Sequence, residues 1–131
     1  VVTVTADVNK SKDANGIATF FFGHETHSDI NSPTGARLAE LIQSELTART
    51  GMKDCRTHAR TWSSLTRLRT PKVHVVSGYL TNMQDLENLE DPNVRDAIAD
   101  GIAAGLQRLY VREDSDPDTG TLSLAEIKAY S

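Results

Sequence analysis

The side chains with the clearest potential for metal chemistry lie together in one polar loop. His24-Glu25-Thr26-His27 is followed closely by Asp29, and imidazole and carboxylate are both zinc ligands. The spacing is one residue shorter than the His-Glu-x-x-His pattern, whose two histidines share one face of a helix. We therefore favour a solvated loop with two titratable histidines, and we retain His24 and His27 as the weaker metal-ligand candidates.

A second chemical feature is a basic segment between residues 49 and 72. It carries seven of the chain's 14 Lys and Arg residues and a single acid, Asp54. Such a rim could bind carboxylates or phosphates, with Arg56 and Arg60 as candidate ligand contacts. The interpretation we favour is a solvated face whose charges pair with acids elsewhere. The basic residues are Arg49, Lys53, Arg56, Arg60, Arg67, Arg69 and Lys72.

Cys55 is the chain's one cysteine, so an intrachain disulfide cannot form. His58 follows shortly after it, but nearness in sequence is a weak sign of a nucleophile and its base. We interpret Cys55 as a structural thiol and Trp62 as a packing anchor. The missing disulfide is typical of a reducing compartment.

Two apolar runs and an opening strand predict the sheet that must position these side chains. Residues 1–6 alternate as a strand, and residues 17–23 are β-prone and almost entirely apolar, which is typical of a strand covered on both faces. The segment around Val73, Val75 and Val76 predicts a further strand. Leu65 and Leu68 predict a short helix that Pro71 ends.

Three capped helices are predicted between and after these strands. Ser32 followed by Pro33 starts a helix that Gly51 ends, and its stripe includes Glu45 among leucines and an isoleucine. Asn82 starts a short helix, and Asp91 followed by Pro92 starts a longer one. The small residues of that last helix predict a close approach to a sheet: Ala97, Gly101 and Gly105. The order of elements is an α/β pattern.

Composition narrows the class of protein further. The chain has 131 residues, a net charge of -4 and 38 % hydrophobic residues, which suits one globular domain with an aliphatic core. The acidic balance argues against nucleic acid as a partner. No apolar run approaches the roughly 18 residues of a transmembrane segment.

The chain divides into a folded part and a tail. Residues 1–111 hold the predicted elements, whereas residues 112–131 form an acidic linker and a tail that contains Thr119 and Thr121. Phosphorylation of either threonine would add about -1.5 to -2 charges, so both are candidate phosphosites. Because the chain opens within a strand and without Met, we expect sequence upstream of Val1.

Four stretches together resemble the zinc-dependent N-acetylmuramoyl-L-alanine amidase family, Amidase_3. They are residues 15–23, 33–51, 71–82 and 92–99. Enzymes of this family cut the amide between muramic acid and the stem peptide of peptidoglycan. The resemblance implies a mostly parallel twisted sheet flanked by helices, with residues 1–111 as the C-terminal part of an N-terminally truncated domain. Truncation would bare strand edges, so we expect self-association through those edges.

The same resemblance implies that catalysis is lost. Aligning residues 3–7 with the family's zinc-ligand strand places Thr5 where a His is expected, and aligning residues 71–79 places Val76 where the catalytic Glu is expected. A neutral hydroxyl is a poor zinc ligand, and valine cannot take a proton from water. Two further ligand motifs would precede Val1.

Three neighbouring side chains could bind a ligand in the vestigial cleft. Asp7 and Ser77 adjoin the two degenerate positions, where they could hydrogen-bond a ligand or satisfy loop backbone equally well. For His74 we favour a partly buried, hydrogen-bonded histidine over a ligand contact.

Residues 50–62, and residues 107–110 with 117–121, resemble the actinobacterial CwlM-type branch of this family. Members of that branch act in the cytoplasm and regulate peptidoglycan precursor synthesis under Ser/Thr kinase control. This implies a regulator without a cofactor, whose partner is a precursor-synthesis enzyme or a forkhead-associated adaptor, or whose ligand is peptidoglycan or its precursor. The alternative is an active zinc amidase outside the cytoplasm, with His24 or His27 as a replacement ligand.

Overall fold

One mixed sheet forms the centre of the molecule. The computed structural model describes residues 1–66, 71–110 and 118–123. In this part of the chain β1 (Val2–Asp7), β2 (Ile17–Phe22), β3 (Asp54–Arg60) and β4 (Val73–Tyr79) form a four-stranded sheet in the order β1-β4-β2-β3. The pairs β1/β4 and β2/β3 are parallel, and only β2/β4 is antiparallel. The predicted α/β fold with a mostly parallel sheet is confirmed.

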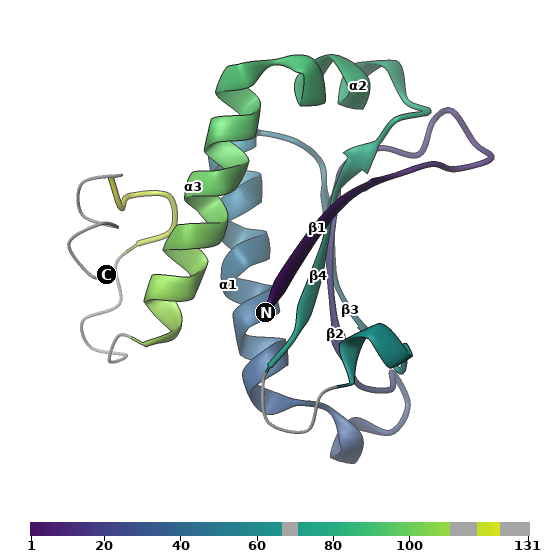
Figure 1. The fold of residues 1–131 in the computed structure, drawn as a ribbon, viewed down its shortest axis with the longest axis vertical. Coiled ribbons are helices and arrows are strands. Elements are labelled where there is room, and N and C mark those ends of the chain that lie inside the picture. Colours follow the sequence, from purple (N-terminus) through teal and green to yellow (C-terminus); the bar gives the residue numbers. More distant parts are fainter. Residues whose placement is uncertain (67–70, 111–117, 124–131) are drawn as a thin grey trace.

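The two long helices cover the same face of this sheet. Figure 1 shows α1 (Pro33–Thr50) and α3 (Pro92–Leu109) side by side on that face, with α2 (Met83–Glu90) near the end of β4. The core lies between the helices and the sheet. Among the described residues, no helix is both long and apolar enough to cross a membrane. The largest fully buried apolar side chains of this core are Ile17, Ile42, Leu46, Val73 and Val75.

The helix starts predicted from capping residues are confirmed. The Ser32 hydroxyl accepts the Gly35 N–H at 3.0 Å, and Asn82 and Asp91 cap α2 and α3 in the same way. Gly51 ends α1 in the left-handed region, with φ at 69°, and its N–H bonds back to the helix. Each cap satisfies backbone groups that have no partner within the helix.

Strand β3 was not predicted, and of the short helix expected through Leu65 and Leu68 only the part up to Thr66 lies among the described residues. The structure has a 3-10 turn at Ser63–Leu65, and Leu68 lies outside the described residues. β3 is a polar edge strand with a bulge: Arg56 has φ of 67°, and its N–H donates to the Asp54 side chain at 2.8 Å. The bulge breaks the period-2 pattern by which a strand is recognised.

The small residues of α3 approach a helix and not a sheet, which corrects the prediction. A Cβ added at Gly105 would lie 2.7 Å from Cγ1 of Ile42, and one at Gly101 would lie 2.8 Å from Cδ2 of Leu46. Both partners are on α1. Glycine therefore lets the two long helices touch at these points.

Candidate functional site

The structure brings side by side the two residues that the family resemblance aligns with a zinc ligand and the catalytic base. Thr5 of β1 and Val76 of β4 are register partners in the parallel β1/β4 pair. Thr5 is exposed, whereas Val76 is buried with 3 % exposure. Residues paired in register point to the same face of a sheet. The Thr5 hydroxyl and the Val76 isopropyl group therefore lie next to each other on one face.

An imidazole reaches the Thr5 position from the same face. His74 Nε2 lies 3.0 Å from the Thr5 hydroxyl oxygen. The His74 ring also lies edge-on to Trp62, with centroids 6.3 Å apart, and Trp62 packs on Phe20 at 4.9 Å. Trp62 is nevertheless 43 % exposed. This cluster gives the face opposite the long helices an aromatic patch beside Thr5.

Asp7 and Ser77 both contact backbone in this structure. The buried Ser77 hydroxyl donates to the carbonyl of Thr5 at 2.9 Å, and the Asp7 carboxylate accepts the N–H of Val8 at 3.0 Å. Ser77 thereby ties β4 to β1 directly beside the Thr5–Val76 pair. Asp7 is exposed and orders the start of the following loop.

Cys55 and Tyr79 lie near the carboxyl end of β4, where both side chains have raised pKa values. Burial raises the pKa of the Cys55 thiol, and Asp85 and Asp54 raise it further while Lys53 opposes them. Burial likewise raises the pKa of Tyr79. The thiol donates to the carbonyl of Asn15 at 3.1 Å. A thiol of raised pKa is a weak nucleophile at neutral pH, which agrees with a structural role.

The buried carboxylate of Asp85 organises this end of the sheet, and sequence reasoning did not single it out. Its Oδ2 accepts the N–H groups of Gly16 and Tyr79, each at 2.9 Å, and Asp85 is 2 % exposed. Two strands and α2 are thus joined through one side chain.

His24 and His27 lie at the other end of the sheet from the Asp7 and Tyr79 ends of β1 and β4. β2 runs antiparallel to β4, so the loop after Phe22 follows the end of β2 that pairs with the start of β4. The two imidazole rings lie 4.8 Å apart, and Glu25 pairs with Arg60 at 2.7 Å. In residues 1–66, 71–110 and 118–123, no three His, Cys, Asp or Glu side chains are grouped to hold a metal ion.

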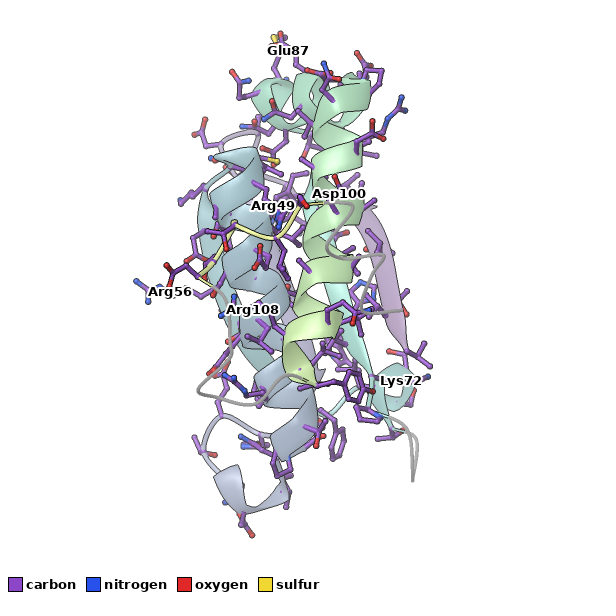
Figure 2. All side chains as sticks on the ribbon, turned by 90° about the vertical axis from the view of Figure 1, so that its left-hand side faces the viewer. Arg49, Arg56, Lys72, Glu87, Asp100 and Arg108 are labelled. Atoms are coloured by element: carbon purple, nitrogen blue, oxygen red, sulfur yellow. The ribbon has the colours of Figure 1, made fainter. Side chains whose placement is uncertain are left out.

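The basic segment does not gather into one rim. Figure 2 shows Arg56 and Lys72 on different sides of the molecule, while Arg49 lies between the long helices. Arg60 pairs with Glu25 beside an open depression of about 300 Å³, and Lys72 donates to the carbonyl of Ser64. Arg67 and Arg69 lie outside the described residues.

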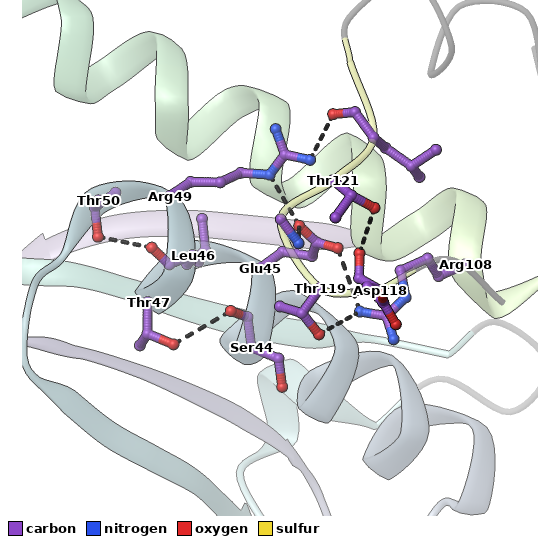
Figure 3. A network of polar contacts seen from close by, with 12 residues as sticks. Ser44, Glu45, Leu46, Thr47, Arg49, Thr50, Arg108, Asp118, Thr119 and Thr121 are labelled. Atoms are coloured by element: carbon purple, nitrogen blue, oxygen red, sulfur yellow. Dashed lines mark hydrogen bonds and ion pairs between the residues drawn. The ribbon is translucent and has the colours of Figure 1, made fainter.

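A buried polar cluster around Glu45 was missed by sequence reasoning. Glu45 of α1 is 0 % exposed, and its carboxylate accepts from Arg49 at 2.8 Å and from Arg108 of α3 at 3.2 Å (Figure 3). It also accepts the N–H of Gly120 at 3.0 Å. A glutamate within an apolar helical stripe was the available signal, because a buried carboxylate requires cationic partners.

The two threonines of the tail differ in their surroundings. The Thr119 hydroxyl accepts a hydrogen bond from Arg108 Nη1 at 3.1 Å, whereas the Thr121 hydroxyl donates to the carbonyl of Asp118. Both residues are exposed, and Leu122 next to them is buried with 4 % exposure.

Curated relatives resemble the chain along most of its length. CwlM of Mycobacterium tuberculosis, described as an N-acetylmuramoyl-L-alanine amidase, is 43 % identical over 130 residues, which are 99 % of this chain and 32 % of that protein. LytC of Bacillus subtilis, also described as an N-acetylmuramoyl-L-alanine amidase, is 28 % identical over 109 residues, which are 83 % of this chain and 21 % of that protein. The chain therefore spans a third or less of the length of these relatives.

Solved structures share the fold. The catalytic domain of CwlV, an N-acetylmuramoyl-L-alanine amidase from Bacillus (Paenibacillus) polymyxa var. colistinus, gives a TM-score of 0.69 at 22 % identity over 81 % of this chain and 54 % of its own. The CwlD amidase from Clostridioides difficile, solved in complex with the GerS lipoprotein, gives a TM-score of 0.71 at 21 % identity over 82 % of this chain and 52 % of its own.

A family profile matches almost all of the ordered domain. The Amidase_3 profile, described as N-acetylmuramoyl-L-alanine amidase, covers residues 1–108. That range contains all the strands and helices of the described structure except the last residue of α3, Leu109. The chain belongs to the N-acetylmuramoyl-L-alanine amidase family, Amidase_3.

Proposed function

We propose that this chain is a catalytically degenerate amidase domain that regulates cell-wall precursor synthesis. The observation that carries the proposal is the register pairing of Thr5 with Val76, at the two positions where the family resemblance expects a zinc ligand and a catalytic base. These two substitutions lie on adjacent strands and on one face of the sheet. Together they remove a zinc ligand and the base that would take a proton from water.

The side chains at this position do not fit a zinc ion. Thr5 offers a neutral hydroxyl, Val76 offers only hydrocarbon, and the Nε2 atom of His74 is engaged with the Thr5 hydroxyl. Zinc sites in proteins are built from imidazole, thiolate and carboxylate groups. One imidazole beside a hydroxyl and a valine leaves the position short of ligands and without a proton acceptor.

The test is release of stem peptide from a defined muropeptide by the complete protein with added zinc. We expect no turnover. A Thr5→His, Val76→Glu double variant should gain stoichiometric zinc and measurable turnover. The matched control is Thr3→His with Val76→Glu, because Thr3 pairs with His74 and not with Val76. Turnover by the unmodified protein would overturn the proposal.

A regulatory role is supported by the similarity to CwlM and by the exposed tail threonines. The partner of such a regulator would be a precursor-synthesis enzyme, or a forkhead-associated adaptor that binds phosphorylated Thr119 or Thr121. This reading places the protein in the cytoplasm. Binding of a forkhead-associated domain to peptides phosphorylated at one threonine or the other tests it, and phosphate-independent binding would contradict it.

The second candidate is an active zinc amidase outside the cytoplasm. Family membership favours it, as does His74, whose Nε2 reaches within hydrogen-bond distance of the Thr5 position. His74, and not His24 or His27, would then be the replacement ligand. Zinc stoichiometry of a His74→Ala variant of the complete protein distinguishes the candidates, because only the active enzyme would lose metal.

A further inference from the structure

A short segment beyond α3 lies in the seam between the two long helices. Of the described tail residues 118–123, only Leu122 is buried, and it packs on Ala103 and Ala104 of α3. These three residues form a small apolar cluster that is separate from the main core. The segment therefore rests on the folded domain and does not contribute to its interior.

Polar contacts with α1 and α3 hold the segment in place, and three of them join residues that the structure describes. The Gly120 N–H donates to Oε2 of Glu45 at 3.0 Å, and the carbonyl of Leu122 accepts from Nη2 of Arg49 at 2.7 Å. The Thr119 hydroxyl accepts from Nη1 of Arg108 at 3.1 Å. Two of these contacts use backbone atoms of the segment, and the Leu122 side chain packs against Ala103 and Ala104. Residues 118–121 form a turn, in which the Thr121 N–H donates to the carbonyl of Asp118 at 3.2 Å. Main-chain bonds combined with a side-chain pocket are a common mode of peptide recognition.

The charged groups that contact the segment are paired with one another by the two helices alone. Glu45 is paired with Arg49 on its own helix and with Arg108 across the seam, at 2.8 and 3.2 Å. Both ion pairs lie entirely within α1 and α3. Removing the segment would hydrate the carboxylate but leave it with both cationic partners. The seam is thus preorganised to accept a backbone N–H and to donate to a carbonyl.

The geometry is selective for sequence. Gly120 has φ of 80°, a left-handed conformation that other residues rarely adopt, so glycine is preferred at this position. The apolar surface of Ala103 and Ala104 accepts an aliphatic side chain two residues after the glycine, which is Leu122 here. The hydroxyl of Thr119, the residue before the glycine, accepts a hydrogen bond from Arg108.

We propose that the seam between α1 and α3 is a binding site for peptides of the form Thr-Gly-x-Leu that turn at the Thr-Gly pair, as residues 118–121 do here. The chain's own residues 119–122 occupy it in cis. A partner protein that presents the same pattern exchanges with them, so the tail acts as a competitor for that partner.

The test uses the full chain and an acetylated, amidated, fluorescein-labelled peptide of residues 118–123. A Leu122→Asp chain, which cannot seat its own segment, should bind the peptide saturably by fluorescence anisotropy. The unmodified chain should bind it at least about 10-fold more weakly, because its own segment competes at high effective concentration. Peptides carrying Gly120→Val or Leu122→Asp are the matched controls and should not bind.

A Gly120→Val chain provides a second way to free the seam and should behave like the Leu122→Asp chain. Glu45→Gln, introduced together with Leu122→Asp, should weaken peptide binding about 10-fold or more, because a charge-assisted bond to the peptide backbone is lost. Equal binding to the unmodified and Leu122→Asp chains would overturn the proposal, as would absence of saturable binding to both opened chains. Loss of helical circular dichroism in both would show that the segment is a structural part of the domain, and would also overturn it.

Discussion

Replacing Gly105 by alanine should destabilise the domain, whereas the same change at Gly101 should be close to neutral. A Cβ at position 105 would lie 2.7 Å from Cγ1 of Ile42 and 3.0 Å from both its backbone N and Cα. Backbone cannot yield locally, so α1 and α3 would have to separate. At position 101 the close atom, at 2.8 Å, is Cδ2 of Leu46, which is the end of a flexible side chain, and the next contact is at 3.5 Å.

The expected magnitudes follow from two opposing terms. Overpacking costs about 1–3 kcal/mol, and the backbone contact at position 105 puts it near the upper end. Alanine in place of glycine within a helix returns about 1 kcal/mol. The free energy of unfolding should therefore fall by about 2 kcal/mol for Gly105→Ala and change by less than about 0.5 kcal/mol for Gly101→Ala.

Urea denaturation followed by circular dichroism measures both changes, since the midpoint shifts while the slope stays constant if compactness is unchanged. The two variants serve as controls for each other because both lie in the interior of α3 and both add one methyl group. A Gly105→Ala domain as stable as the unmodified one would refute the helix-on-helix contact. Greater destabilisation by Gly101→Ala would refute the reasoning about flexible and rigid neighbours.

Three further predictions concern titration, the sheet edge and a buried carboxylate. The pKa of Cys55 is raised above its ordinary value of 9.0, so the thiol contributes stability below that pH, and this contribution is lost as the pH rises through the folded-state pKa. The urea midpoint should therefore fall at alkaline pH, and Cys55→Val should make that fall smaller. The β1 edge should promote self-association, so Val4→Lys should shift sedimentation toward monomer while Val8→Lys, beyond the strand, should not. Asp85→Ala leaves two buried N–H groups without their acceptor and should lower the free energy of unfolding by about 3 kcal/mol in urea titrations.

Much of the fold was predictable because its signals are local. The caps Ser32, Asn82 and Asp91 act on N–H groups within three residues of themselves, so the chain near each helix start carries the whole signal. The apolar strand at residues 17–22 is recognisable because it is buried on both faces. β3 was missed because an edge strand needs little apolar surface and its bulge interrupts the alternation.

The sequence by itself determined which chemical groups occupy positions 5 and 76: Thr5 cannot provide an imidazole, and Val76 cannot provide a carboxylate. Only the tertiary structure decided that these two residues pair in register and that His74 reaches Thr5. The burial of Glu45 was decided there too, because its partner Arg108 is 63 residues away along the chain and the Gly120 N–H is 75 residues away. Such contacts depend on how strands and helices pack, and no local periodicity encodes the packing of distant segments.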